Sequence, residues 1–243
     1  MKGMIFAAGL GTRLRPLTND RPKALVEVCG KPMLQWVIEK FRDAGITEIV
    51  VNVHHFADKI IDFLRENDSF RCDIHISDER SLLLDTGGGI LKAREWLGDS
   101  PFVVHNADIL TDFPLAEMIE AHENSDAIAT LLVADRRSSR YLLFDPGLQM
   151  RGWENIKTGE TRPEEIDASS FRRLAFGGVH VLSPEVFDSL SQFSTEPVFS
   201  IIPFYVGLSQ RAKIQGYIPS KPYQWFDIGS PEKLRDAEEK FHR

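Results

Sequence analysis

The chain has 243 residues, of which 42% are hydrophobic and 27% charged, and its formal net charge is −7. A negative balance argues against general binding to nucleic acid or to an anionic membrane, because both require a broad basic surface. No apolar run approaches the roughly 20 residues of a membrane span, and Cys29 and Cys72 have no metal-ligand spacing. We therefore expect a cytoplasmic globular protein with no nucleic-acid or membrane partner.

Strand and helix patterns alternate through the first half of the sequence. Short apolar runs predict buried strands, and they cover residues 4–8, 48–53, 72–77, 101–105 and 127–134. Helical patterns lie between them, at about residues 31–44, 57–66, 90–97 and 115–123. Because strands that alternate with helices form parallel neighbours, we expect a Rossmann-like, doubly wound α/β fold, with a mainly parallel, mixed sheet and helices on both faces.

The second half begins with a less regular segment. Residues 136–173 are rich in Arg, Gly and Glu and predict a hairpin and a long loop, whereas residues 174–182 return to a strand pattern. Two Ser-Pro-Glu sequences, at 183–185 and 230–232, predict helix starts with proline at the first helical position. No repeat or low-complexity linker divides the chain, so we expect one domain over residues 1–243, with halves 1–135 and 136–243.

The most informative segment follows the first strand, where a glycine loop is joined to fixed cations. Gly9 and Gly11 lack a Cβ, so the backbone can turn sharply and bring N–H groups against phosphate oxygens. Arg13, Arg15 and Lys23 can add charge-assisted hydrogen bonds. The pattern is neither a Walker loop nor a dinucleotide-binding Gly-x-Gly-x-x-Gly. A lone Gly-x-Gly favours a solvated turn, but the whole segment predicts a triphosphate site.

Two carboxylates follow apolar segments that are far apart in the sequence. Asp108 lies at the end of a predicted strand, at the sheet edge where open α/β folds bind ligands. Asp227 stands between the aromatic pair Trp225-Phe226 and Gly229. Each could serve only in a turn, as aspartate often does after strands. Together, two carboxylates and substrate phosphates suit Mg²⁺, which takes few protein ligands and keeps waters.

These segments resemble the sugar-1-phosphate nucleotidyltransferases. Residues 9–18, followed by Pro22-Lys23, are similar to the signature loop Gly-x-Gly-Thr-Arg-Leu-x-Pro-Leu-Thr of that family, with Ala24 where many relatives have a second proline. The resemblance extends over nearly the whole chain and implies a nucleotide-diphospho-sugar transferase (GT-A-like) fold. It also implies that the loop wraps a nucleoside triphosphate, that Arg13 assists the departure of pyrophosphate, and that Lys23 holds the reacting phosphates.

The resemblance implies the remaining site residues. Asp108 and Asp227 match the two metal motifs of the family, which implies that they bind Mg²⁺, with Mn²⁺ as a substitute. Residues 84–90 resemble the glycine segment that contacts base and ribose ahead of a helix. The predicted nucleotide-binding residues are Ala7, Ala8, Gly9, Gly11, Thr12, Arg13, Lys23, Asn52, Asp85, Thr86, Gly87 and Gly88. The predicted sugar-phosphate-binding residues are Asn106, Asp108, Gly177, Gly178 and Asp227, and the predicted catalytic residues are Arg13, Lys23 and Asp108.

One family feature is missing from the sequence. Many relatives carry Glu-Lys-Pro before the strand at 174–182, and its lysine holds the sugar phosphate, whereas this chain has Arg-Gly-Trp-Glu-Asn-Ile-Lys at 151–157. The sequence therefore leaves open which cation binds that phosphate. The absence is typical of the short branch of the family, which implies UTP and N-acetylmuramate 1-phosphate as substrates, a place in cell-wall sugar recycling, and a monomer or homodimer.

Other functions remain open at this stage. Mannose-, glucose- or heptose-1-phosphate, or phosphocholine, could be the acceptor, with another base in the nucleotide. A non-catalytic nucleotide-sugar sensor would carry a broken loop or a lost carboxylate, and neither is found in this sequence. A metal-dependent glycosyltransferase could use Asn106-Ala107-Asp108 as its Asp-x-Asp, but that function does not account for the loop at residues 9–23.

Overall fold

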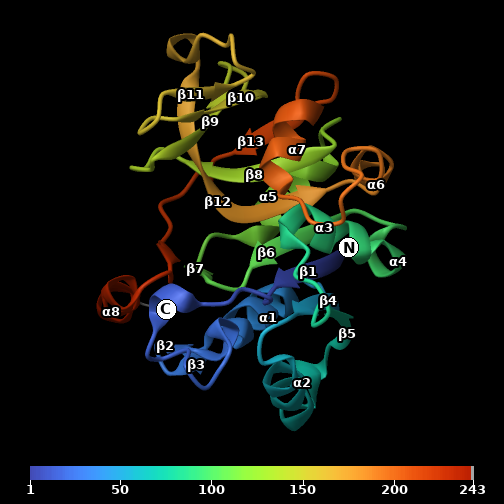
Figure 1. Cartoon of the computed structure of the whole chain (residues 1–243), viewed down its shortest axis with the longest axis vertical. Helices are drawn as coiled ribbons and strands as arrows, with labels where there is room; N and C mark the ends of the chain where they lie inside the picture. Colours follow the sequence, from blue (N-terminus) through green and yellow to red (C-terminus); the bar gives the residue numbers. More distant parts are fainter. Residues whose placement is uncertain (242–243) are drawn as a thin grey trace.

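A parallel sheet forms the centre of the molecule. The computed structural model describes residues 1–241, and ten of their strands form one continuous sheet (Figure 1). Its parallel part contains, in spatial order, β5 (Asp73–Asp78), β4 (Glu48–Val53), β1 (Lys2–Phe6) and β6 (Phe102–Asn106). The carboxyl ends of these parallel strands therefore meet at one edge, where ligand sites form in open α/β sheets.

The long strand β12 (Arg172–Leu182) carries the sheet into the second half of the chain. It runs antiparallel to β6, β8 (Ala129–Ala134) and β9 (Arg140–Phe144), with an irregularity between Phe176 and His180. Outside it lie β10 (Met150–Asn155), β11 (Glu160–Arg162) and β13 (Ile214–Tyr217). The predicted mixed sheet with a parallel centre is therefore confirmed.

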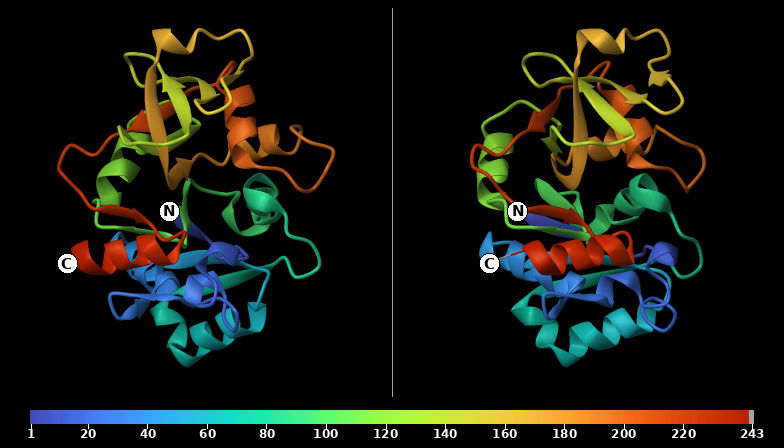
Figure 2. Two further views of the ribbon diagram at one scale, coloured as in Figure 1. Left: turned by 60° about the vertical axis from the view of Figure 1, so that its left-hand side comes forward. Right: turned by 90° about the vertical axis from the view of Figure 1, so that its left-hand side faces the viewer.

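Helices cover both faces of this sheet (Figure 2). Successive strand residues point to opposite faces, so Ile5 packs in one core and Met4 in the other. The Ile5 face is covered by α1 (Met33–Asp43), α2 (Ala57–Glu66) and α5 (Leu115–Glu123). The Met4 face is covered by α3 (Asp85–Lys92), α4 (Arg94–Leu97), α6 (Val186–Leu190) and α7 (Ile201–Leu208). This two-sided packing is the predicted doubly wound arrangement.

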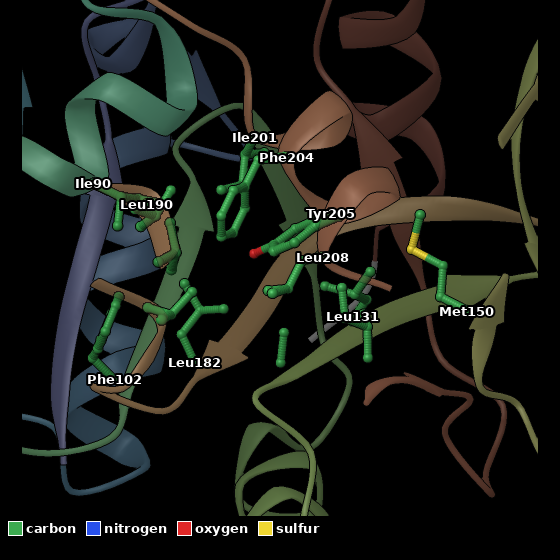
Figure 3. Packing of buried hydrophobic residues seen from close by; sticks show 14 of the residues in the cluster. Ile90, Phe102, Leu131, Met150, Leu182, Leu190, Ile201, Phe204, Tyr205 and Leu208 are labelled. Atoms are coloured by element: carbon green, nitrogen blue, oxygen red, sulfur yellow. The ribbon is translucent and has the colours of Figure 1, made fainter. Parts of the chain in front are cut away.

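The core on the Met4 face joins the two halves of the chain. Figure 3 shows Phe204, Tyr205 and Leu208 of α7 converging on Leu131 and Leu182 of the sheet. The buried Tyr205 hydroxyl hydrogen-bonds Nδ1 of His180 on β12. None of the helices within residues 1–241 combines the length and apolar character needed to cross a bilayer.

The last segment of the chain returns to the N-terminal half. The strand β14 (Trp225–Asp227) pairs antiparallel with β7 (Ile109–Thr111). The helix α8 (Pro231–Lys240) then packs beside β2 (Glu27–Val28), which pairs with β3 (Lys31–Pro32) (Figure 2). Ser230 accepts a hydrogen bond from the Lys233 N–H, as the Ser-Pro-Glu pattern predicts. This return brings Asp227 to the edge of the parallel sheet.

Several predicted elements differ from the structure. The helix expected from residue 31 begins at Met33, because Lys31–Pro32 form β3. The helix α6 begins at Val186, so Pro184 is not its first helical residue as predicted. The first strand ends at Phe6 rather than at residue 8. The helix expected from residue 90 begins at Asp85, so its glycines lie inside the helix, and it breaks into α3 and α4 at Ala93. Residues 136–173 contain the expected hairpin, β9 with β10, but part of the expected long loop forms a further strand, β11, that pairs with β10. The elements α7 and β13 had no predicted counterpart.

Candidate active site

The loop after β1, residues 7–11, is shaped to accept an anion. Gly11 has a φ of +65°, in the left-handed region, and a Cβ there would lie 2.9 Å from Cβ of Lys23. Thr18 Oγ1 donates to the Gly11 carbonyl at 2.8 Å and closes the loop. Among residues 1–241, no hydrogen-bond acceptor is paired with the N–H groups of Gly9, Leu10 or Gly11. These donors are therefore available to phosphate oxygens, as the sequence predicts.

Asn52 holds the start of this loop in place. Its Oδ1 accepts hydrogen bonds from the N–H groups of Ala7, at 2.8 Å, and Ala8, at 3.2 Å. Its Nδ2 donates to Oε1 of the fully buried Glu79 at 2.8 Å, and Oε2 of Glu79 accepts from the Leu84 N–H. The polar groups of Ala7, Ala8 and Asn52 are thus used within the protein. Their direct contact with a nucleotide stays a prediction, whereas the positioning role of Asn52 is new.

We expect Asn52→Ala to lower both stability and nucleotide affinity. The change leaves two loop N–H groups and one Glu79 oxygen without partners in a buried site, which costs about 1–3 kcal/mol per unsatisfied group. Denaturant unfolding and the KM for the nucleotide measure the two effects. The exposed Asn124→Ala on the C-terminal side of α5 is the matched control. Wild-type stability together with a wild-type KM in Asn52→Ala contradicts this role.

Lys23 and Asp108 meet at the carboxyl edge of the sheet. Lys23 opens a short 3-10 helix (Lys23–Leu25), and Asp108 follows β6. The Lys23 ammonium forms an ion pair with Oδ2 of Asp108, and the two side chains are 12% and 29% exposed. Both side chains are therefore mostly buried, and both line the same cavity.

The second carboxylate reaches this edge through strand pairing. In the β14–β7 pair Asp227 lies opposite Ile109, and the Ile228 N–H donates to the Asp108 carbonyl at 2.8 Å. Asp227 Oδ2 pairs with Lys233 of α8 at 2.5 Å. A Cβ on Gly229 would lie 3.0 Å from Asp227 Oδ1 and 3.3 Å from Nη2 of Arg13. The structure therefore brings Arg13, Lys23 and both carboxylates to one edge.

A cavity of about 390 Å³ lies over the loop and the Lys23–Asp108 pair. The predicted site residues that line it are Ala7, Ala8, Gly9, Lys23, Asn52, Asp85, Thr86, Asn106 and Asp108. Phe6, Leu83 and Val198 also line it, and sequence reasoning missed them. Gly11, Thr12, Arg13, Asp227 and the four predicted glycines at 87, 88, 177 and 178 lie outside this lining. The lining is mostly apolar, with Lys23, Asp85 and Asp108 as its charged residues, as is typical of a ligand cavity with a few placed polar groups.

The glycines of α3 serve packing. The N–H groups of Gly87 and Gly88 donate to the Phe199 carbonyl, at 2.9 and 3.2 Å. A Cβ on Gly87 would lie 2.3 Å from the Phe199 ring, and one on Gly88 2.2 Å from the Pro197 carbonyl oxygen. Both N–H groups are therefore used within the protein, and the predicted contact of Gly87 and Gly88 with a nucleotide stays a prediction. Nearby, the Thr86 hydroxyl accepts from the Ile201 N–H and ties α3 to α7.

Gly177 and Gly178 permit a close approach of β12 to the carboxylate edge. Gly178 has a φ of +76°, and a Cβ there would lie 2.9 Å from Cγ1 of Ile109 and 3.1 Å from Nδ2 of Asn106. The Gly177 carbonyl accepts from the Trp225 indole N–H at 2.9 Å. This bulge therefore brings the second half of the chain against residues that precede and follow Asp108.

A second cavity, of about 480 Å³, lies between the β9–β11 strands and α7. Tyr141, Trp153 and Phe176 give it aromatic walls, and Arg140 and Arg162 add guanidinium groups. Ser200 lines this cavity and Val198 lines the first one, so residues two positions apart in the sequence contribute to the two cavities. Sequence reasoning missed these residues, although the apolar run at 141–144 could have indicated a strand.

The donor atoms at the edge fit a hard divalent cation. No group of three or more His, Cys, Asp or Glu side chains within residues 1–241 is arranged around a metal position. Asp108 and Asp227 supply carboxylate oxygens at neighbouring backbone positions. Each carboxylate forms an ion pair with a lysine, so both already attract a positive charge. Two carboxylates suffice for Mg²⁺ when phosphates supply further oxygens.

Comparisons with known proteins agree with this geometry. The family model described as nucleotidyl transferase matches residues 2–243. The chain is 33% identical over 243 residues to an N-acetylmuramate alpha-1-phosphate uridylyltransferase of Caulobacter vibrioides, covering 97% of this chain and 94% of the relative. It is 32% identical over 240 residues to a mannose-1-phosphate guanyltransferase of Hypocrea jecorina, covering 96% and 62%. A solved structure of UDP-glucose pyrophosphorylase from Acinetobacter baumanii matches with a TM-score of 0.78 at 20% identity, over 98% of this chain and 91% of that one. The resemblance read from the sequence is thereby confirmed, and the chain belongs to the nucleotidyl transferase family as a sugar-1-phosphate nucleotidyltransferase.

Proposed function

We propose that this protein transfers a uridylyl group from UTP to N-acetylmuramate 1-phosphate, as a step of cell-wall sugar recycling, with Mg²⁺ held by Asp108 and Asp227. The observation that carries the transfer is the loop with unpaired N–H groups beside the Lys23–Asp108 pair. The choice of substrates rests on the similarity to the uridylyltransferase and on the second cavity. The 32% identity to a guanyltransferase makes mannose 1-phosphate with GTP the alternative that an experiment must separate.

The proposed reaction needs no protein nucleophile. An oxygen of the acceptor phosphate attacks the α-phosphorus of the nucleotide, the bond from that phosphorus to the β-phosphate oxygen breaks, and pyrophosphate leaves. The acceptor phosphate is already an anion at neutral pH, so the protein contributes position and charge stabilisation. Bound Mg²⁺ supplies charge neutralisation for the phosphates.

Each residue at the edge has a distinct task in this reaction. The loop N–H groups of Gly9 to Gly11 hold non-bridging phosphate oxygens. Lys23 stabilises the negative charge that develops around the α-phosphorus, and its pairing with Asp108 fixes its direction. Arg13, beside Asp227, faces the departing pyrophosphate and stabilises its charge.

The second cavity supports an acidic acceptor. N-acetylmuramate carries a carboxylate in addition to its phosphate, whereas mannose and N-acetylglucosamine do not. Arg162 lies 5.5 Å from the Trp153 ring centroid and pairs with Glu160, while Arg140 contributes a second guanidinium to the lining. Arginine is well suited to planar recognition of a carboxylate. The aromatic side chains of Tyr141 and Trp153 provide flat surfaces for the sugar ring.

The experiment is a grid of pyrophosphate release in the presence of Mg²⁺. UTP, GTP, CTP, ATP and dTTP are each combined with N-acetylmuramate, N-acetylglucosamine, glucose, mannose and heptose 1-phosphates and with phosphocholine. We expect the largest kcat/KM for UTP with N-acetylmuramate 1-phosphate. A larger value for GTP with mannose 1-phosphate contradicts the proposed substrates, and an empty grid contradicts transfer to any of these acceptors.

Arg140→Gln tests the recognition of the acceptor carboxylate. We expect the KM for N-acetylmuramate 1-phosphate to rise about 10-fold, since a hydrogen bond to a charged group contributes about 1.5–3 kcal/mol. The KM for N-acetylglucosamine 1-phosphate should stay the same, because that acceptor has no carboxylate. Arg211→Gln, on the exposed turn after α7, is the matched control. Equal changes for both acceptors contradict carboxylate recognition by Arg140.

A further inference from the structure

Arg136 is a cation for which the fold provides no carboxylate partner. It follows β8 and precedes β9, and no ion pair within residues 1–241 includes its guanidinium at 4.0 Å or less. Its Nη2 donates to the Phe176 carbonyl at 2.6 Å. Its Nε is buried with no hydrogen-bond partner, and Nη1, which also has none, is not fully buried. Most of the hydrogen-bonding capacity of this guanidinium is therefore unused.

The surroundings of Arg136 keep its guanidinium in one place. The guanidinium carbon lies 3.8 Å from the centroid of the Trp225 ring, so the guanidinium is in cation–π contact with this ring. The Trp225 N–H in turn donates to the Gly177 carbonyl, next to the Phe176 carbonyl that Arg136 holds. Burial lowers the pKa of Arg136, and the charge of Asp227 acts in the opposite direction. Burying a charged guanidinium in this way costs folding free energy unless an anion binds to it.

The position of Arg136 lies between the two parts of the candidate active site. On one side, Phe176, whose carbonyl it holds, lines the second cavity. On the other side, Trp225 belongs to the same short strand as Asp227, whose neighbour Ile228 is bonded to Asp108. An acceptor whose sugar occupies the second cavity must place its phosphate between that cavity and the carboxylate edge. Arg136 belongs to the lining of neither cavity, but its contacts with Phe176 and Trp225 place it between the second cavity and this edge.

We propose that Arg136 binds the phosphate of the acceptor and holds its attacking oxygen toward the α-phosphorus. The inference rests on the proposed function, since it takes a sugar 1-phosphate as the acceptor. It assigns the cation that the missing Glu-Lys-Pro sequence leaves open. A phosphate bound at Nη1 would provide the anionic partner that Arg136 lacks within the protein. The cation–π contact with Trp225 and the hydrogen bond to the Phe176 carbonyl fix the orientation of the guanidinium. Arg136 is an acceptor-binding residue in this account, and no covalent step passes through it.

The test uses Arg136→Gln and Arg136→Lys in the full-length protein, with the exposed neighbour Arg137→Gln as control. We expect Arg136→Gln to raise the KM for the acceptor about 10- to 100-fold, the range for loss of a charged hydrogen bond. In the same variant, the KM for the nucleotide should change by less than about 2-fold, because no hydrogen bond to the nucleotide is lost. Arg136→Lys should recover part of the acceptor affinity, and Arg137→Gln should behave as wild type.

Two further measurements separate the possible outcomes. Calorimetric titration of the acceptor without nucleotide should show the same loss of affinity in Arg136→Gln, and thermal unfolding reports on the fold. Equal rises in both KM values together with a lower Tm overturn the proposal in favour of a structural role. If the wild-type protein is active and Arg136→Gln has an unchanged KM for the acceptor, the proposed role of Arg136 is overturned and the proposed function stands. Wild-type protein that neither transfers to nor binds any sugar phosphate overturns the proposed function, and Arg136 binding with it.

Discussion

Asp108→Asn and Asp227→Asn are each expected to reduce nucleotidyl transfer by about 10³-fold, the scale for losing one preorganised electrostatic group. Asparagine keeps the shape of the side chain but removes the charge that attracts a divalent cation. In Asp108→Asn, Lys23 also loses its ion-pair partner. The fold should be retained, because Asp108 and its neighbours are held by backbone bonds such as Ile228 N–H to the Asp108 carbonyl.

The measurement is pyrophosphate release over a range of Mg²⁺ concentrations, with circular dichroism as the check on folding. Asp126→Asn is the matched control, since Asp126 also pairs with a lysine, Lys213, but far from the sheet edge and 81% exposed. Partial recovery of the two site variants at high Mg²⁺ is the expected signature of weakened metal binding. Near-normal turnover of both variants at low Mg²⁺ contradicts the metal assignment.

Lys23→Ala is expected to lower kcat by about 10²-fold or more, because it removes a positioned charge from the reacting phosphates. The side chain is only 12% exposed, so solvent cannot supply an equivalent cation. The variant also leaves Asp108 without its partner, which should raise the KM for the nucleotide through repulsion between carboxylate and phosphate.

Lys213→Ala is the control for Lys23→Ala, because it removes the lysine of the exposed pair with Asp126. Steady-state kinetics with the nucleotide varied at saturating acceptor give kcat and KM separately. An unchanged kcat in Lys23→Ala removes Lys23 from the reacting site. An unchanged kcat with a raised KM assigns it to nucleotide binding alone.

Much of the parallel sheet and its helices could be predicted because the sequence of each element shows its own pattern of hydrophobic residues. The strand at Glu48–Val53 and the helices at Ala57–Glu66 and Leu115–Glu123 have the predicted bounds. The motifs also led correctly to a gathering of Arg13, Lys23 and the two carboxylates at one edge. In these cases the pattern of a short window contains the information that decides the structure.

The rest depends on contacts between distant segments, which no short window contains. The helix α3 begins at Asp85 because the Phe199 carbonyl accepts from Gly87 and Gly88, which have weak helical propensity of their own. The burial of Arg136 depends on Trp225, although its neighbours Asp135 and Arg137 suggest a solvated charged turn. The positioning role of Asn52 likewise depends on Glu79, whose burial its own sequence surroundings do not indicate.

The packing of Gly87 and Gly88 against residues 197–199 limits which residues related proteins can have at these two positions. Any protein that keeps this architecture needs both glycines, because a side chain there meets Phe199 or the Pro197 carbonyl. If Lys23, Asp108 and Asp227 act as proposed, a paralogue that had lost catalysis would retain the glycine run but would no longer need these three residues. Under the proposed function, the glycine run would then be found in active and inactive relatives alike, and the lysine with its two aspartates would be found in the active ones.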